Sequence, residues 1–176
     1  MNEILKYTTV NVVVKDRETG LMLFSDHNLF LDAGRVMIAN FFLGSSSLDT
    51  TKFSCDFGND STTPLPTDLD LGGQAIPSTS WITNASAPVS ASYPILLSGT
   101  ATGIHFLFEY TSAAENTVKE LGLFYRPNTD NNPVVGGRGS DPTTMTGTMI
   151  ARLRTTFASI VIGSGKTITI EWKIIF

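Results

Sequence analysis

The chain contains little of the chemistry on which most catalytic and metal sites depend. Its 176 residues include one cysteine, Cys55, and two histidines, His27 and His105. A lone thiol excludes an internal disulfide and a zinc site built on cysteines. Charged residues make up only 16% of the chain and the formal net charge is −4, which argues against an extended surface for nucleic acid.

Long hydrophobic runs are absent as well. The longest apolar segment, 29–43, is interrupted by Asp32, Arg35 and Asn40, whereas a membrane-spanning helix needs about 20 apolar residues. The first residues lack a basic region followed by an apolar stretch, so we expect no signal peptide. At roughly 100–200 residues per domain, we expect residues 1–176 to form a single domain.

Most of the recognisable pattern in the sequence is an alternation of apolar and polar residues, which is typical of β-strands. The expected strands are 8–14, 21–24, 51–57, 104–110, 118–126, 149–157 and 167–176. The last of them has the clearest pattern, because every second residue from Ile168 to Phe176 is large and apolar. Strands of this kind, separated by turn residues, predict a mainly β fold: an antiparallel β-sandwich (jelly-roll-like) with one N-terminal helix.

One segment departs from this alternation. Residues 30–43 are continuously apolar around Val36, and Gly44 follows where a left-handed C-cap belongs. Asn28 or Asp32 could cap the start. The pattern predicts a helix at about 32–43 that is apolar all round and therefore packs on both sides, against the sheets or another subunit.

Two stretches rich in Ser, Thr, Asn, Asp, Pro and Gly predict long loops, at about 58–95 and 127–147. Proline removes a backbone donor and fixes φ, which disfavours a strand within them. Loops of this length in a compact domain are usually functional or wrap a neighbour.

The segment 163–167, Gly-Ser-Gly-Lys-Thr, ends like a phosphate-binding loop. That loop requires another glycine where Ile160 stands, and a helix whose N-terminus holds the phosphate. Because a strand pattern follows instead, the segment is expected to be a hairpin turn.

Carboxylates suggest two other sites. Glu109 and Glu120 could form the acid pair of a glycosidase, although charged residues commonly oppose one another on facing strands. An acidic loop could hold calcium, but it lacks the EF-hand pattern, and turn chemistry explains the residues equally well. The loop carboxylates are Asp56, Asp60, Asp68 and Asp70.

The remaining charged and titratable residues are expected in structural roles. His105 lies on the mixed face of a strand and His27 in a turn, and a Ser-His-Asp site would need one of them. Arg152 and Arg154 share a strand face that could bind acidic partners or simply face solvent or a subunit. We therefore expect no catalytic residues, no metal ligands and no cofactor.

Aromatic residues offer a binding alternative. Phenylalanine dominates them and suits burial, whereas sugar-binding platforms rely more on Trp and Tyr. Trp172 lies in a core strand, so the candidate contacts for a glycan or partner are Trp81, Tyr93 and Tyr125.

Several short motifs follow one another in a distinctive order. They are Asn-Leu-Phe-Leu-Asp-Ala-Gly at 28–34, Phe-Gly-Asn-Asp at 57–60 with Pro66-Thr67 after it, Glu-Leu-Gly-Leu-Phe at 120–124, Ala151-Arg152 with Phe157, and Thr-Ile-Glu-Trp-Lys-Ile at 169–174. This order, which covers about 28–176, resembles structural proteins of tailed bacteriophage virions, in which an N-terminal strand and helix precede a β-sandwich.

The resemblance implies a non-enzymatic, homo-oligomeric part of the virion, in the tail, baseplate, collar or head surface. Its partners would be further copies of itself and other virion proteins, with no nucleic acid and no membrane. The alternative is a receptor- or glycan-binding β-sandwich module of a phage appendage. A third hypothesis, a polysaccharide hydrolase, has no catalytic set to support it.

Overall fold

The computed structural model of the chain describes residues 9–44, 49–61, 63–67, 71, 81–99, 102–125, 148–154 and 159–176. Over these residues the strands are β1 (Thr9–Asp16), β2 (Met22–Phe30), β3 (Phe53–Gly58), β4 (Trp81–Pro88), β5 (Ile95–Leu97), β6 (Gly103–Thr111), β7 (Asn116–Val118), β8 (Glu120–Tyr125), β9 (Thr148–Arg154), β10 (Ile160–Ile162) and β11 (Thr167–Ile175). The helices are α1 (Asp32–Phe42) and a short 3-10 turn, η2 (Thr50–Lys52).

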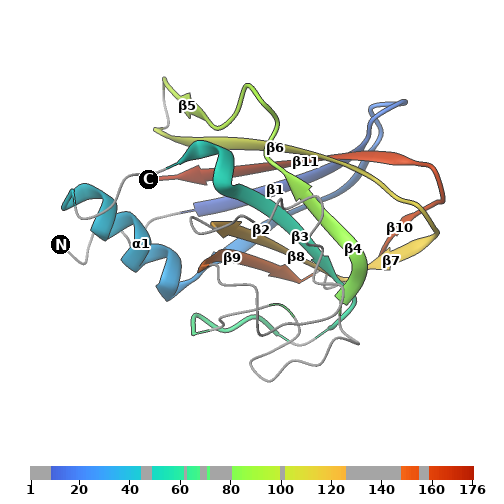
Figure 1. The fold of residues 1–176 in the computed structure, drawn as a ribbon, viewed down its shortest axis with the longest axis horizontal. Helices are drawn as coiled ribbons and strands as arrows, with labels where there is room; N and C mark the ends of the chain where they lie inside the picture. Colours follow the sequence, from blue (N-terminus) through green and yellow to red (C-terminus); the bar gives the residue numbers. More distant parts are fainter. Residues whose placement is uncertain are drawn as a thin grey trace.

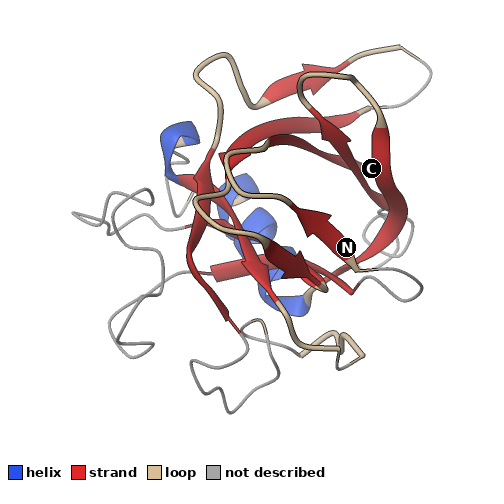
Figure 2. Cartoon of the chain, turned by 90° about the vertical axis from the view of Figure 1, so that its right-hand side faces the viewer, coloured by secondary structure: helices blue, strands red, loops and turns tan. Residues whose placement is uncertain are grey.

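Nine strands form one antiparallel sheet in the order β4-β3-β8-β9-β2-β1-β11-β6-β5, and β7 pairs with β10 separately. The sheet bends back over itself, as the two views show (Figures 1 and 2). Its two halves then face each other: the ring of Phe53 on β3 lies 4.8 Å from that of Phe106 on β6. A bridge between Val89 and Phe108 links the halves again after β4. The prediction of a mainly β, antiparallel sandwich with one N-terminal helix is confirmed.

The core lies between the two halves and follows the alternation of the sequence. Val10, Val12 and Val14 of β1 are fully buried, and β11 buries Trp172 beside them. β11 pairs with β1 along its whole length, and with β6 on its other side. Removing a large apolar side chain from water contributes about 1.5–3 kcal/mol, so this central group of strands holds much of the stability.

Helix α1 begins and ends close to the predicted bounds. Arg35 and Asp32 form an ion pair of 2.7 Å in its first turn, and Gly44 follows its last turn with a φ of +67°, the left-handed conformation that glycine adopts without strain. Met37 and Ile38 pack against the core.

Val36 on the helix and Leu43 just after it face solvent in the single chain, so packing of the helix on a second side, against another subunit, stays a prediction. The suggestion that Asn28 caps the helix is wrong. Asn28 lies within β2, and its side chain accepts a hydrogen bond from the backbone of Leu29.

The expected loop at about 58–95 needs correction. It contains β4 and the first residue of β5. β4 carries no alternating apolar pattern; it forms because β3 offers it a backbone ladder, and such pairing overrides intrinsic preference. The expected strand at 118–126 divides at Lys119 into β7 and β8. The expected loop at 127–147 lies outside the described residues.

Candidate functional site

The three aromatic residues predicted to contact a glycan or partner lie in different environments. Tyr125 is part of the core: its ring lies 5.0 Å from that of Phe53, and its hydroxyl accepts a hydrogen bond of 3.0 Å from the backbone N–H of Asp49. Its ring is therefore not a surface platform. Trp81 begins β4, with its backbone opposite Gly58, and its side chain lies outside the described part. Tyr93 lies half-buried on the connection between β4 and β5.

Tyr93 belongs to a polar cluster on the outer face of the sheet. Its ring contacts that of His105 edge-on, with 5.1 Å between centroids. His105 Nε2 lies 3.5 Å from Glu171 Oε2, and Lys15 Nζ donates to Glu171 Oε1 at 2.6 Å. Lys173 approaches Glu171 Oε2 at 3.4 Å. Side chains alternate between the two faces of each strand. The neighbours of these four groups on β1, β6 and β11 face the core, so Lys15, His105, Glu171 and Lys173 all lie on the outer face.

The charges of this cluster set the protonation of its members. Partial burial opposes ionisation of Glu171, but the hydrogen bond and charge of Lys15 outweigh it and lower the pKa of Glu171 below its ordinary value. Burial, and then the charge of Lys173, lower the pKa of His105, although Glu171 opposes this. The result is a neutral imidazole beside a carboxylate neutralised by two lysines.

His105 is a packed side chain of this cluster. Its side chain is 12% exposed, and Nε2 has no hydrogen-bond partner among the described residues. His27 lies on the same outer face, where Nδ1 contacts Asn11 Oδ1 at 2.5 Å. The described residues hold no group of three or more potential metal ligands.

The proposed carboxylate pair is not formed. Glu109 is exposed on β6, between the core residues Phe108 and Tyr110. Glu120 is buried on β8, next to the core residue Leu121. Because alternate residues point to opposite faces, the two carboxylates lie on opposite outer faces of the sandwich.

The acidic loop does not form one surface cluster either. Asp56 is a buried residue of β3, whereas Asp60 lies beyond that strand, where its side chain accepts from the backbone of Ser61. Asp68 and Asp70 lie outside the described residues. Arg152 and Arg154 take their places on β9 opposite Gly122 and Glu120, but their side chains lie outside the described part.

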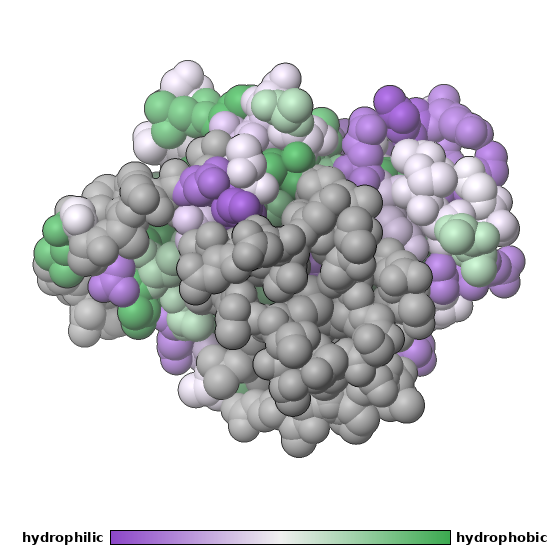
Figure 3. Space-filling view, in the orientation of Figure 1, coloured by the Kyte–Doolittle hydropathy of each residue, from purple (hydrophilic) through white to green (hydrophobic). Residues whose placement is uncertain are grey.

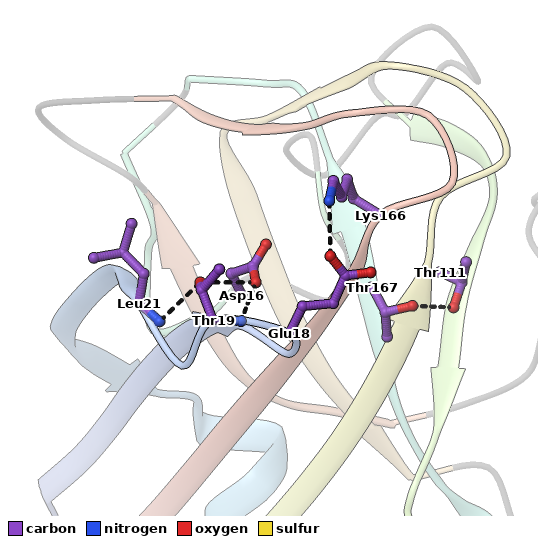
Figure 4. Close-up of polar contacts among 7 residues, drawn as sticks. All are labelled: Asp16, Glu18, Thr19, Leu21, Thr111, Lys166 and Thr167. Atoms are coloured by element: carbon purple, nitrogen blue, oxygen red, sulfur yellow. Dashed lines mark hydrogen bonds and ion pairs between the residues drawn. The ribbon is translucent and has the colours of Figure 1, made fainter.

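The segment 163–167 is a turn, as predicted. The N–H of Lys166 donates to the carbonyl of Gly163 at 3.1 Å, and Gly165 has a φ of +73°. Figure 4 shows Lys166 paired with Glu18 at 2.8 Å and the hydroxyl of Thr167 bonded to that of Thr111. The lysine is thus held by a neighbouring turn.

Two of the motifs that carry the resemblance, 28–34 and 120–124, meet in a second buried cluster on the outer side of β8. Leu31, Leu71 and Phe124 form it. Gly122 provides the room, because a Cβ there would lie 2.6 Å from Phe124 Cε2 and 2.9 Å from Leu71 Cδ2. Nearby, the N–H of Asp32 donates to the carbonyl of Pro66 at 2.9 Å. These motif residues therefore share one packing role.

One stretch of exposed apolar side chains lies at the edge of the main sheet. β5 pairs with β6 on one side, and it is the last strand in the order of the described residues. Leu96 is 72% exposed and Ile95 42% exposed. Figure 3 shows apolar residues gathered at its upper left, over β5, whereas the turns at the upper right are polar. We call Ile95, Leu96 and Leu97 the edge surface.

Sequence reasoning missed this surface. The signal was the apolar run after Pro94. Ile95 lies at the end of the loop expected at about 58–95, and no strand is predicted for Leu96 and Leu97. Other large apolar side chains also face solvent, at the β1–β2 turn and the start of β2 (Leu21, Met22 and Leu23), on α1 (Val36) and just after it (Leu43). The edge surface differs from them because its strand has no neighbour on one side among the described residues, and an open apolar edge can pair with another strand.

No helix within the described parts of the chain has the length and apolar character to cross a membrane. No family model, curated protein or solved structure matches the chain.

Proposed function

We propose that the chain is a non-enzymatic structural protein of a tailed-bacteriophage virion that assembles as a homo-oligomer. It would be made in the host cytoplasm and would take its place in the tail, baseplate, collar or head surface. Its partners would be further copies of itself and other virion proteins.

The observation that carries this proposal is the set of large apolar side chains left in water by a weakly charged sandwich. Leu96 on β5 is the most exposed of them, at 72%. Apolar surface removed from water contributes about 25 cal/mol per Å², so contacts between copies through such residues are favourable. A chain with 16% charged residues also has few charges to desolvate on assembly.

The virion part of the proposal rests on the resemblance, and the packing of its motifs supports it. Gly122, Phe124 and Leu31 belong to two separate motifs, yet they contribute to one buried contact between β8 and the start of α1. These residues limit one another's size, so proteins that share this fold would be expected to keep them together. The polar cluster around Glu171 fits the same view, because its carboxylate pairs with Lys15 and Lys173 within one subunit.

The test has two parts. Light scattering behind a sizing column gives the mass of the purified protein over a range of concentrations, and a discrete oligomer is expected. Mass spectrometry of purified phage particles from the host that carries the gene should then recover the chain at many copies per particle. A monomer at every concentration together with absence from particles would refute the proposal. A monomer that binds glycans on an array, with loss on Tyr93→Ala, would favour the receptor-binding alternative.

A further inference from the structure

We propose that the edge surface pairs with the edge surface of a second copy, as two antiparallel β5 strands related by a two-fold axis near Leu96. This inference rests on the proposed homo-oligomeric function and names the surface through which two copies meet. It extends the nine-stranded sheet of one copy into that of the next.

The backbone ladder decides which groups of β5 are available. The N–H of Phe176 donates to the carbonyl of Thr102, and β11 pairs with β6 in the same register from Ile175 to Thr167. Even-numbered residues of β6 therefore bond to β11, and odd-numbered residues such as Gly103 and His105 bond to β5. Because Leu97 and Ile95 are their partners, the N–H and C=O of Leu96 point away from the sheet.

The side chains of β5 are apolar and suit pairing with another apolar strand. On the inner face, Val10, Ile174, Ile104 and Leu96 form one row across four strands. Burial decreases along this row: Val10 and Ile174 are buried, Ile104 is half-buried and Leu96 is mostly exposed. The apolar row therefore extends beyond the part of the sheet that the opposite half of the sandwich covers. β5 carries no charged side chain and no bulge, although it is only three residues long and follows Pro94, and both of these features limit pairing at an edge.

A second copy fits this edge better than an unrelated charged strand. Antiparallel pairing about Leu96 places Leu96 opposite its own copy, and Ile95 opposite Leu97 of the other chain, so every cross-strand pair is apolar. β5 itself carries no charge, and the row through Ile95 reaches a charged side chain only at Lys173, two strands inward and beyond His105. No like charges therefore oppose each other at the paired edges.

The experiment compares two equally exposed leucines. Leu96→Lys places a charge at the axis, while Leu43→Lys places the same charge in the turn just after α1, at 70% exposure instead of 72%. Both side chains are largely in water, so both variants should fold, which circular dichroism and thermal unfolding verify. Sedimentation equilibrium of the wild type and both variants then gives the dimerisation constant, which Leu96→Lys should weaken at least tenfold and Leu43→Lys should leave unchanged.

A second pair of variants tests the geometry. The native thiol, Cys55, is buried, so Leu96→Cys and Leu43→Cys each offer one accessible thiol. A short bis-maleimide should link two copies of Leu96→Cys, because residues opposite one another in antiparallel strands have Cβ atoms about 4.5–5.5 Å apart. It should not link Leu43→Cys at the same protein concentration.

The outcomes separate the two proposals. If the wild type oligomerises and Leu96→Lys oligomerises equally well, the edge pairing is wrong while the homo-oligomer stands. If Leu96→Cys is protected from the reagent in a monomer, another segment of the chain covers the edge, and the pairing is again wrong. If the wild type stays monomeric at every concentration and Leu96→Cys is freely labelled, both the edge pairing and the homo-oligomer are refuted.

Discussion

Gly122 provides the sharpest test of the packing beneath the motif at 120–124. Replacing it with alanine adds one methyl group in a site without free space. The added Cβ would lie 2.6 Å from Phe124 Cε2 and 2.9 Å from Leu71 Cδ2, both closer than carbon atoms approach in proteins. Phe124 and Leu71 are themselves fully buried, so each can move only by displacing other core atoms.

The expected cost follows from this geometry. Overpacking a filled core typically destabilises a protein by about 1–3 kcal/mol. In a domain of this size each kcal/mol lowers Tm by about 2–4 °C, so Gly122→Ala should lower Tm by about 2–12 °C. Gly163→Ala is the matched control, because its Cβ would meet only Lys166 Cγ, at an ordinary 3.5 Å, and its Tm should stay within about 1 °C of the wild type.

Calorimetry or circular dichroism of the two variants measures the difference. Leu71→Ala supplies a further test, because it removes one of the two atoms against which the new methyl group clashes. On its own it should destabilise by opening a cavity, yet in the double variant part of the Gly122→Ala cost should disappear. A Gly122→Ala protein with the Tm of the wild type, or strictly additive effects in the cycle, would refute the assigned packing.

Three other predictions concern single groups. Burial, more than any other influence, raises the pKa of the Cys55 thiol, so Ellman's reagent should react with it only after denaturation, and rapid labelling of the native protein would contradict its place in the core. The lowered pKa of His105 means that the folded protein binds this proton less readily than the unfolded chain, whose ordinary value is 6.5. Its contribution is therefore complete above about pH 6.5 and is lost as pH falls below it, so Tm should decline between about pH 7 and pH 5 more steeply than in His105→Gln, and parallel curves would argue against it. Gly165→Ala should cost about 1–2 kcal/mol because of the φ of +73°, with Gly165→Asn costing less; equal costs in a urea titration would contradict the turn geometry.

The sequence was sufficient where one physical effect dominated. β1, β6 and β11 alternate strongly because one face of each is buried, and their predicted bounds differ from the observed ones by no more than one or two residues. The helix was found for the opposite reason, since a continuous apolar run ending at Gly44 does not suit a half-exposed strand. The turn at 163–167 followed from a missing glycine and the strand pattern after it.

The parts that failed depend on contacts between distant segments. β4 lacks an apolar alternation, and only its pairing with β3 makes it a strand. Tyr125 looked like a possible platform, but the face of β8 that it occupies is the core face, which the sequence of an all-apolar strand does not reveal. The edge surface was equally hidden, because which strand ends a sheet is a property of the strand order and not of any local pattern.

The pairing of β1 with β11 has a consequence for the order in which the protein can be made. Thr9 lies opposite Ile175 and Asp16 opposite Ile168, so β1 stays without its second neighbour until the ribosome has added residues 167–175. The hairpin with β2 can form early, but Val10, Val12 and Val14 keep their apolar face uncovered through most of translation. Closing so long a loop is slow, and during that interval the uncovered apolar face is open to association with other nascent chains.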